Sequence, residues 1–328
     1  MKAVRIHDDG GPDVLRIEDV PDPEPGPGEV LVRLRTASLN HLDVWVRRGL
    51  PSVPKPRILG ADGAGVVEAL GEGVDGLMQG QRVVLNPGLE HDDTISVVGE
   101  HCDGTHAELI AIAAEQVFPL DDALSFEEAA AFPLVYETAY RMLVTRAAVA
   151  EGEWALIWGI GGGVSTAAFE ICRALGLKTI VTSGSDAKLD VARSWGADVA
   201  VNHSDGDVVA AVKEATGQGV HVVVESVGEA TWARTLAAVR PAGRVVVCGA
   251  TTGPNPPAQL HRFWWKQLTV LGSTMGTRED FLGAYDLVRT RRARIHVDRV
   301  YPLAEIAAAH ERLEAGAQLG KIVLAIPG

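Results

Sequence analysis

The segment 154–183 holds the residues whose types and spacing point most clearly to chemistry. An apolar run, 154–158, leads into Gly159-Ile-Gly-Gly-Gly163, which is followed by an amphipathic stretch, 164–175, and a second apolar run, 179–182. This order predicts a strand, a turn, a helix and a second strand. Glycines lack a Cβ, so the N–H groups of the turn can approach a phosphate that faces the positive end of the helix. We therefore favour a dinucleotide-binding turn over a plain connection between strand and helix.

Alternating strand-like and helix-like segments follow this turn. We expect helices at 187–195, 208–216 and 230–239, and strands at 199–201, 220–225 and 244–248. Such alternation predicts an α/β fold with a doubly wound parallel sheet covered by helices on both faces. The ligand of such a sheet lies beyond the carboxyl ends of its strands.

The two ends of the chain predict a second, mainly β domain. Strand-like runs occur at 1–7, 30–37, 65–71 and 82–85, separated by turn-forming segments such as the proline-rich 21–28. Ser125-Phe-Glu-Glu128 fits a capping box that starts a helix running to residue 143. The last segment, 279–328, holds two helix patterns and an apolar end, and it is expected to return to the first domain. The predicted domains are 1–123 with 276–328, and 124–275.

Composition limits the classes of partner. The 328 residues are 47% hydrophobic and 22% charged, which suits a globular protein of two domains, and the formal net charge is −13. That charge argues against nucleic acid or an acidic membrane surface as partner, and it does not exclude an anionic cofactor. The expected partner is a small-molecule substrate. Cys102, Cys172 and Cys248 lack CxxC spacing, and the last two are expected to be buried. The absence of a signal-peptide core and of a long apolar run predicts a cytoplasmic protein.

Several further motifs follow one another in a familiar order. They are Ala37-Ser-Leu-Asn-His-Leu-Asp43, Leu59-Gly-Ala-Asp-Gly-Ala-Gly-Val-Val67, Asp103-Gly-Thr-His-Ala-Glu108, Pro133-Leu-Val-Tyr-Glu-Thr-Ala139 and Gly320-Lys-Ile-Val-Leu324. With them the chain resembles the medium-chain dehydrogenase/reductase superfamily over essentially its full length, and most closely its zinc-independent quinone oxidoreductase and enone-reductase branch. The resemblance implies a discontinuous GroES-like domain, a central Rossmann domain and a cleft between them that holds the nicotinamide.

The glycine turn departs from the pattern of that branch at its last position. The branch has AxxGxxG, whereas this chain has Gly159-x-x-Gly162-x-x-Ser165. The Ser165 hydroxyl either bonds a phosphate or packs between helix and strand, and the sequence does not decide between the two.

The resemblance also bears on metal binding. Zinc-dependent relatives use a Cys, a His-Glu pair and a further Cys or Asp, and the matching positions here carry Asn40, Ala61 with Asp62, and Leu134. Alanine and leucine cannot ligate, so we expect no catalytic zinc. The segment that would form a structural zinc lobe is interpreted as a hydrophilic loop. Its polar residues are Glu90, His91, Asp92, Asp93, His101 and Cys102.

The end of the second strand bears on the choice of cofactor. NAD-selective sites place an acid there to bind the ribose 2′-OH, and the resemblance puts Ser183 at that position. A small hydroxyl leaves room for a 2′-phosphate, Lys188 supplies a cation, and His203 can assist. Asp186 weakens this interpretation, and Ser185 with Lys188 also fits a plain N-cap and solvated helix. We expect NADPH.

The resemblance places the other cofactor contacts at strand ends and loops, with Lys321 near the pyrophosphate or ribose. These contacts are Thr138, Gly159, Gly161, Gly162, Gly163, Val164, Gly184, Ser226, Val227, Gly249, Ala250, Ser273, Thr274, Met275 and Lys321.

Without zinc, hydride transfer to a plain ketone loses Lewis-acid stabilisation, whereas a conjugated acceptor delocalises the charge itself. The sequence therefore predicts an NADPH-dependent reductase of quinones or activated alkenes (enones and enals). Asn40 is the candidate hydrogen-bond donor, with satisfaction of a local turn as its alternative role. Asp43 is more often an ordering residue than a proton donor, and Tyr136 is a weaker donor candidate.

Two other functions stay open, a zinc-independent alcohol or carbonyl dehydrogenase and a non-catalytic NADPH-binding protein. The segment 270–273 resembles the edge strand through which relatives pair their sheets, which predicts a homodimer or homotetramer. Phe263-Trp-Trp265 either walls a substrate pocket or packs in the core or between subunits.

Overall fold

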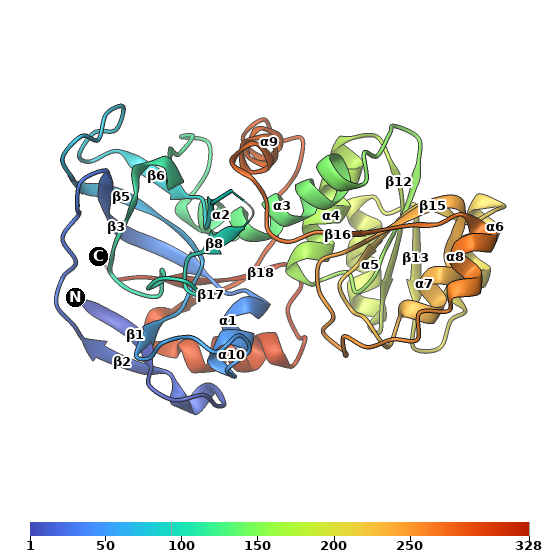
Figure 1. Cartoon of the computed structure of the whole chain (residues 1–328), viewed down its shortest axis with the longest axis horizontal. Helices are drawn as coiled ribbons and strands as arrows, with labels where there is room; N and C mark the ends of the chain where they lie inside the picture. The colour runs from blue at the N-terminus through green and yellow to red at the C-terminus, as the bar shows by residue number, and fades with distance from the viewer. Residues whose placement is uncertain (93, 328) are drawn as a thin grey trace. The chain divides into compact units, whose positions relative to one another are not determined.

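The computed structural model describes residues 1–92 and 94–327, so Asp93 of the expected hydrophilic loop lies outside the described residues. The chain divides into two compact units. The first consists of Met1–Val135 and Ile295–Gly328, and the second of Tyr136–Arg294. Figure 1 shows the strands of both units, and each β-sheet lies within one unit.

A six-stranded parallel sheet forms the centre of the second unit, in the order β13-β12-β11-β14-β15-β16. The strands are β11 (Trp154–Ile157), β12 (Lys178–Ser183), β13 (Val199–Asn202), β14 (Val220–Glu225), β15 (Val239–Val247) and β16 (Thr269–Gly272). From β11 the chain proceeds outward to β13, then returns to β14 on the other side of β11. Because parallel crossovers are right-handed, this reversal places the connecting helices on opposite faces. The expected Rossmann-type, doubly wound sheet is confirmed.

The connecting helices of this unit lie where the sequence pattern places most of them. They are α4 (Gly163–Ala174), α5 (Asp186–Trp195), α6 (Val208–Thr216), α7 (Trp232–Ala238), α8 (Leu260–Lys266) and α9 (Arg278–Arg289). The core between sheet and helices is apolar, with Leu156, Ile180 and Val223 each fully buried. Burial on both faces explains the continuous valine and isoleucine runs of these strands.

The first unit is mainly β, as the GroES-like expectation requires. Its larger sheet has the order β10-β6-β5-β3-β18-β17, with β9 also paired to β3, and its smaller sheet has the order β2-β1-β4. The strands of the larger sheet are β3 (Glu29–Ser38), β5 (Asp62–Leu70), β6 (Arg82–Leu85), β9 (Leu109–Ala113), β10 (Val117–Pro119), β17 (Val297–Pro302) and β18 (Lys321–Ala325). The smaller sheet contains β1 (Lys2–Ile6), β2 (Arg16–Asp19) and β4 (Arg57–Ile58), and β7 (Gly88–Glu90) forms a hairpin with β8 (Ile95–Val97).

The C-terminal strand joins both ends of the chain in this unit. β18 runs antiparallel to β3, with Val323 opposite Ser38 and Ala325 opposite Thr36. The N–H of Leu39 donates to the carbonyl of Ile322 at 3.0 Å just beyond the end of β3. The first residue of β18, Lys321, is thereby brought beside the segment that leads into α1 (His41–Arg47). α10 (Ile306–Glu314) precedes this strand in the chain.

Some boundaries differ from the expected ones. The helix expected to run to residue 143 consists of α2 (Phe126–Ala131), α3 (Pro133–Tyr140) and a π-helical segment, Arg141–Arg146. The capping box of Ser125 with Glu128 is present, but Pro133 has no N–H and starts a new helix. α9 contacts α4 and therefore belongs to the second unit, which ends at Arg294 rather than at 275.

The cysteines differ from one another in exposure. Cys172 is buried as expected, whereas Cys248 is only partly buried because it follows the last residue of β15, at the end of the sheet. Within residues 1–92 and 94–327, no helix combines the length and apolar character needed to cross a membrane.

Candidate functional site

The glycine turn after β11 is shaped to accept a group close to its backbone. Gly159 and Gly161 have φ angles of +69° and +110°, a region that glycine adopts without strain. No heavy atom lies within 4 Å of a Cβ built on Gly159, so the space above it is open. α4 begins at Gly163, and its N-cap, Gly162, supplies no side-chain cap, which leaves the first N–H groups available to an anion. This turn therefore fits a pyrophosphate.

Ser165 has a role inside the turn. Its side chain is 5% exposed, and its Oγ donates to the carbonyls of Gly159 at 2.7 Å and Gly162 at 2.9 Å. The hydroxyl hydrogen is thus used to fix the turn against the helix, which favours the packing role over phosphate binding. One position further, the Thr166 hydroxyl is buried and has no hydrogen-bond partner among the described residues.

The expected cofactor contacts of this unit gather at one edge of the sheet. Because all six strands are parallel, the residues that follow them share the carboxyl edge. They are Gly159–Val164 after β11, Ser183 and Gly184 at the end of β12, His203 after β13, Ser226 and Val227 after β14, Gly249 and Ala250 after β15, and Ser273–Met275 after β16. Thr138 lies on α3 and Lys188 in the first turn of α5.

A buried carboxylate that the sequence analysis missed orders the loop after β14. Glu225 is fully buried and accepts from the N–H of Val227 at 2.8 Å and of Gly228 at 3.1 Å. The hydroxyl of Thr235 on α7 donates to the same carboxylate at 2.6 Å and accepts from the indole N–H of Trp158 at 2.7 Å. An acid that ends a run of valines, with threonines six and ten residues later, is the signal that could have revealed this network.

The last residue of β12 is Ser183, which has no carboxylate. Ser183 is 5% exposed and accepts from the N–H of Ser185 at 3.1 Å. The Asp186 carboxylate accepts from the side-chain amide of Asn202 at 2.9 Å, so it is held beside β13. His203 lies 3.2 Å from the Thr182 hydroxyl, and burial followed by the charge of Arg234 lowers the pKa of its imidazole.

Arg234 is a cation at this end of the sheet that sequence reasoning did not find. Its guanidinium lies 5.0 Å from the centre of the Trp158 ring and donates to the carbonyls of His203 at 3.2 Å and Ala230 at 3.1 Å. Among the described residues no carboxylate forms an ion pair with it. Its charge is therefore available to an anion.

The loop after β16 has two unusual features. Met275 has a φ of +46° although it is not glycine, a strained conformation that is most common at functional sites. The Ser273 hydroxyl is buried without a partner among the described residues. Both residues belong to the expected cofactor contacts. No contact among the described residues accounts for either feature.

In the first unit, three residues from distant parts of the sequence form a buried polar cluster. The Lys321 ammonium donates to the Asn40 side-chain carbonyl at 2.5 Å, the Leu39 carbonyl at 2.8 Å and the Asp62 carboxylate at 3.0 Å. The Asn40 amide nitrogen donates to the same carboxylate oxygen at 2.9 Å. Lys321 and Asn40 are each 4% exposed, and Asp62 is fully buried. We call Asn40, Asp62 and Lys321 the amide cluster.

The Asp62 carboxylate is satisfied by further donors. The Ser38 hydroxyl donates to Oδ2 at 3.0 Å, and the N–H of Leu134 donates to Oδ1 at 2.8 Å. Leu134 occupies the position that the resemblance matches to a metal ligand, and here it contributes its backbone N–H. Ala61, at another such position, has no ligating atom in its side chain and is buried.

Asp43 positions the backbone beside the amide cluster. Its carboxylate accepts from the N–H of Asn40 at 2.7 Å and from the N–H of Gly60 at 3.0 Å. Burial raises the pKa of Asp43 to about 7, although the bond from Asn40 and the charge of Lys321 lower it. This geometry supports the expected ordering role rather than proton donation to a substrate.

Two sequence predictions gain no support from these contacts. The Tyr136 hydroxyl is buried and donates to the carbonyl of Arg294, and burial raises its pKa well above the usual value, so it is unsuited to donate a proton. All three ammonium hydrogens of Lys321 are directed at protein acceptors. Binding a pyrophosphate would require one of those bonds to break.

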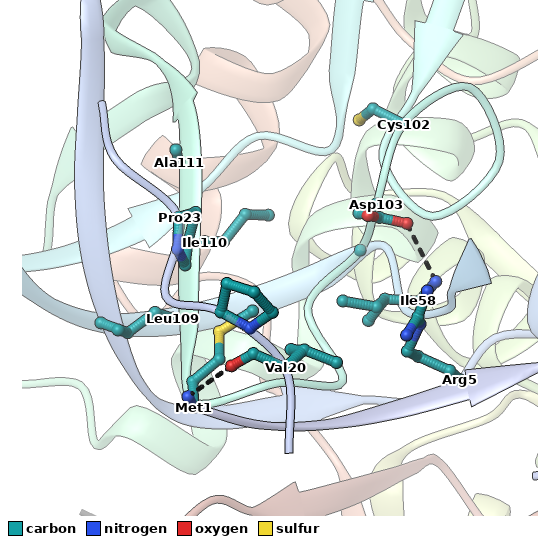
Figure 2. Close-up of a pocket in the computed structure, with 12 residues that line it drawn as sticks. Met1, Arg5, Val20, Pro23, Ile58, Cys102, Asp103, Leu109, Ile110 and Ala111 are labelled. Carbon is teal, nitrogen blue, oxygen red and sulfur yellow. Dashed lines mark hydrogen bonds between the residues drawn. The ribbon is translucent and has the colours of Figure 1, made fainter. Parts of the chain in front are cut away.

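A separate hollow lies elsewhere in the first unit. Its volume is about 330 Å³, and Figure 2 shows the N-terminal amine of Met1 donating to the Val20 carbonyl at one side of it. Its lining residues are Met1, Arg5, Val20, Pro21, Pro23, Ile58, Cys102, Asp103, Gly104, Leu109, Ile110 and Ala111. None of them belongs to the amide cluster or to the expected cofactor contacts.

Among residues 1–92 and 94–327, no three His, Cys, Asp or Glu side chains are grouped so that they could hold a metal ion.

Comparison with known proteins covers both units. Residues 26–122 match the family model of the alcohol dehydrogenase GroES-like domain, and residues 163–290 match that of the zinc-binding dehydrogenases. The quinone oxidoreductase of Pseudomonas aeruginosa is 34% identical over 98% of this chain and 99% of its own length.

Two solved structures are similar over nearly the whole chain. One, an NAD-dependent alcohol dehydrogenase, is 39% identical with a TM-score of 0.96 over 100% of both chains. Another is the 2-octenoyl-CoA carboxylase reductase CinF in complex with NADP and 2-octenoyl-CoA. It is 26% identical with a TM-score of 0.92 over 99% of this chain and 87% of its own.

Replacement of Asp43 by Asn should remove a pH dependence of stability. The folded protein retains the Asp43 proton up to pH about 7, whereas the unfolded chain loses it near pH 3.8. The contribution of Asp43 is therefore complete below about pH 4 and lost as the pH rises toward 7. The free energy of unfolding of the wild type, minus that of Asp43→Asn, should fall by up to about 1.4 kcal/mol per pH unit in this window.

Urea denaturation at pH 4.5, 5.5 and 6.5 measures that difference. Asp75→Asn, at an exposed position of the same unit, serves as the control and should show no such trend. Parallel pH curves for the wild type and Asp43→Asn would mean that Asp43 is ionised throughout.

Proposed function

The chain belongs to the medium-chain dehydrogenase/reductase superfamily, in its quinone oxidoreductase branch, and from this premise we propose that it reduces quinones or activated alkenes with NADPH and without catalytic zinc. It is an NAD(P)H-dependent oxidoreductase, and the proposal concerns the acceptor, the preferred cofactor and the groups that act. The observation that carries it is the fixed amide of Asn40.

The Asn40 amide offers one hydrogen-bond donor in a defined direction. Its carbonyl accepts from Lys321 and its nitrogen donates one hydrogen to Asp62. The second hydrogen on that nitrogen has no acceptor in the part of the chain that the structure describes. We assign this hydrogen to the oxygen of the acceptor, where negative charge develops during reduction.

The donor set at the amide cluster does not fit a catalytic zinc ion. A catalytic site needs three protein ligands with free lone pairs. The Asp62 carboxylate already accepts from Ser38, Asn40, Leu134 and Lys321. An ammonium group also lies within the cluster and would repel a divalent cation. We therefore propose chemistry that relies on hydrogen bonding.

A reduced nicotinamide, when bound, would supply a hydride, that is, two electrons and one proton. A conjugated acceptor takes it at a carbon remote from the oxygen, and the resulting negative charge spreads into an enolate or an aromatic ring. The Asn40 N–H stabilises that charge, and a solvent proton completes the product. A plain ketone concentrates the full charge on one oxygen, for which a single neutral donor is a weak substitute for a metal.

Turnover with NADPH should be fastest with quinones, slower with enones and enals, and slowest with simple ketones. Asn40→Ala should lower kcat/KM for enones by about 10²-fold, the usual effect of losing one such donor, and for quinones by less. Steady-state oxidation of NADPH, followed at its absorbance band, measures both.

The matched control is Asn86→Ala. Asn86 is also a buried asparagine of the first unit, and its side-chain carbonyl accepts from the N–H of Gly88 at 2.9 Å. It should lower thermal stability and leave kcat/KM unchanged. Turnover confined to ketones would instead support an alcohol or carbonyl dehydrogenase, and tight binding of NADPH without any turnover would support a non-catalytic role.

The preference for NADPH rests on the end of β12. Ser183 offers no carboxylate to the ribose hydroxyls, and the side chain of Asp186 is held by Asn202. Lys188, in the first turn of α5, and the guanidinium of Arg234 supply positive charge. A 2′-phosphate carries up to two negative charges and is stabilised by such cations, whereas NADH gains nothing from them.

Ser183→Asp should reverse this preference. A carboxylate at the end of β12 repels the 2′-phosphate and accepts from the ribose hydroxyls of NADH. The ratio of the Kd values for NADPH and NADH should rise at least about tenfold, because charged hydrogen bonds contribute about 1.5–3 kcal/mol. Isothermal titration calorimetry with each dinucleotide measures the ratio, and Ser194→Asp, at an exposed position of α5, is the control that adds the same charge elsewhere. Equal affinity of the wild type for both dinucleotides would refute the preference.

We further propose that two copies pair through β16. This strand lies at the end of the sheet order, and its outer edge has no partner strand among the described residues. Nearby, Trp264 is 66% and Trp265 84% exposed, which is unusual for tryptophan on a monomer surface. Antiparallel pairing about a twofold axis satisfies the same backbone groups on both copies and makes one continuous sheet.

Val270→Asp should dissociate this dimer. Val270 lies on β16 with 42% of its surface exposed, and the substitution places two like charges near the twofold axis. Analytical ultracentrifugation should show a dimeric wild type and a variant whose dimer dissociates at least about tenfold more readily. Ile17→Asp, on β2 with 43% exposure, is the matched control and should leave the dimer intact. A monomeric wild type would contradict the proposal.

A further inference from the structure

Lys321 is a buried cation whose hydrogens are all committed. Its three acceptors are the carbonyl of Leu39, the side-chain carbonyl of Asn40 and the carboxylate of Asp62. The pairing of β18 with β3 holds its backbone, since the N–H of Leu39 donates to the neighbouring carbonyl of Ile322 at 3.0 Å. Neither the ammonium group nor the strand that carries it can turn elsewhere without the loss of several hydrogen bonds.

The two charged partners determine which way the Asn40 amide points. The ammonium of Lys321 attracts the carbonyl end, and the carboxylate of Asp62 attracts the NH2 end. A flipped amide would place NH2 hydrogens against the ammonium and its oxygen against the carboxylate, and both contacts are repulsive. The direction of the remaining N–H is therefore fixed by Lys321 and Asp62 together.

The bond from Lys321 to the amide oxygen also makes that N–H a stronger donor. A cation bonded to an amide oxygen draws electron density from the nitrogen, and hydrogen bonds in series strengthen one another in a low-dielectric site. Because all three hydrogens of the Lys321 ammonium bond protein acceptors, Lys321 can affect the oxygen of the hydride acceptor only through the Asn40 amide. Burial of all three residues keeps water from screening this effect.

We infer that Lys321 is a positioning residue of the active site, which orients the Asn40 amide together with Asp62 and polarises it toward the oxygen of the hydride acceptor. The inference rests on the proposed function, because it concerns the same acceptor. It replaces the role in pyrophosphate binding that the sequence suggested for Lys321. The two roles predict opposite results for cofactor affinity.

Lys321→Met tests the inference, because methionine has a similar length and carries no charge. The variant should lower kcat with an enone acceptor about tenfold or more, with KM for the acceptor changed by less than about threefold, since the lost effect operates in the transition state. The Kd for NADPH, measured by calorimetry, should stay within about twofold of the wild-type value. A quinone acceptor should show a smaller loss of kcat than the enone.

Lys266→Met provides a matched control. Lys266 also donates to three protein acceptors, the carbonyls of Leu236, Ala237 and Val239 at 2.6–3.0 Å. Its loss should lower thermal stability without a change in kcat. A comparable fall in kcat for both lysine variants would show that the effect of Lys321 is merely structural and would overturn the inference.

A double-mutant cycle shows whether Lys321 acts through Asn40. In the Asn40→Ala background, Lys321→Met should change kcat by less than about twofold, because the group it polarises is already absent. Additive losses in the double variant would overturn the inference.

A variant that removes both charges distinguishes a loss of kcat from a loss of folding. If Lys321→Met leaves a destabilising unpaired carboxylate, Lys321→Met with Asp62→Asn removes both charges, and the same tenfold or greater loss of kcat is expected at a thermal stability near that of the wild type. Unchanged kcat in this double variant, or a large rise in the Kd for NADPH in Lys321→Met, would overturn the inference while leaving the proposed function intact. Absence of turnover in the wild type with every quinone and enone would instead remove the proposed function, and the inference with it.

Discussion

The first unit depends on the placement of one ion pair inside the protein. Lys321 and Asp62 lie 259 residues apart in the chain and meet at 3.0 Å with almost no exposure to solvent. Burying two charges is unfavourable unless each is fully hydrogen-bonded, and here the ammonium has three acceptors and the carboxylate four donors. Removal of one partner of such a pair typically costs about 3–5 kcal/mol. The pair thus requires β18, β3 and the start of β5 to be in register at once.

This requirement connects the shape of the unit to its chemistry. β18 has to return from the far end of the chain and pair with β3, because only then does Lys321 reach Leu39 and Asn40. The capping contact of Asp43 to the N–H of Asn40 fixes the backbone at the same point. The side chain of Asn40 is consequently held by Lys321 and Asp62 and its backbone by Asp43, which is the preorganisation that electrostatic stabilisation of a transition state requires.

The second unit uses backbone groups in place of buried charge pairs. The open turn at Gly159 and the uncapped start of α4 present N–H groups to an anion. The carboxylate of Glu225 holds the next loop by binding two of its N–H groups. Hydrogen-bond donors are thereby fixed at the edge where parallel strands end, which is where such sheets bind dinucleotides.

Local sequence patterns predicted the bounds of several strands and helices. They did not predict features that depend on tertiary packing. The strands 82–85 and 220–225 and the helix 208–216 have the predicted bounds, because period and capping are encoded within a few residues. The long helix expected after Ser125 is divided at Pro133. The assignment of α9 to the second unit depends on its packing against α4, which no local pattern records.

The sequence by itself determined the α/β class and the glycine turn, because each follows from patterns among residues that are close in the chain. The positions matched to zinc ligands came from the resemblance to the family. Only the tertiary structure decided what the polar residues do. Tyr136 and Asn40 were both predicted as candidate donors to the substrate. The hydroxyl of Tyr136 donates to the carbonyl of Arg294, whereas one hydrogen of the Asn40 amide has no acceptor among the described residues. Lys321 and Arg234 contact residues that are remote in the chain, Asn40 and Trp158 respectively. The hydrogen-bond partners of Lys321 at Leu39 and Asn40 lie 282 and 281 residues away in the chain. Sheet register and packing bring them together, and a linear pattern contains neither.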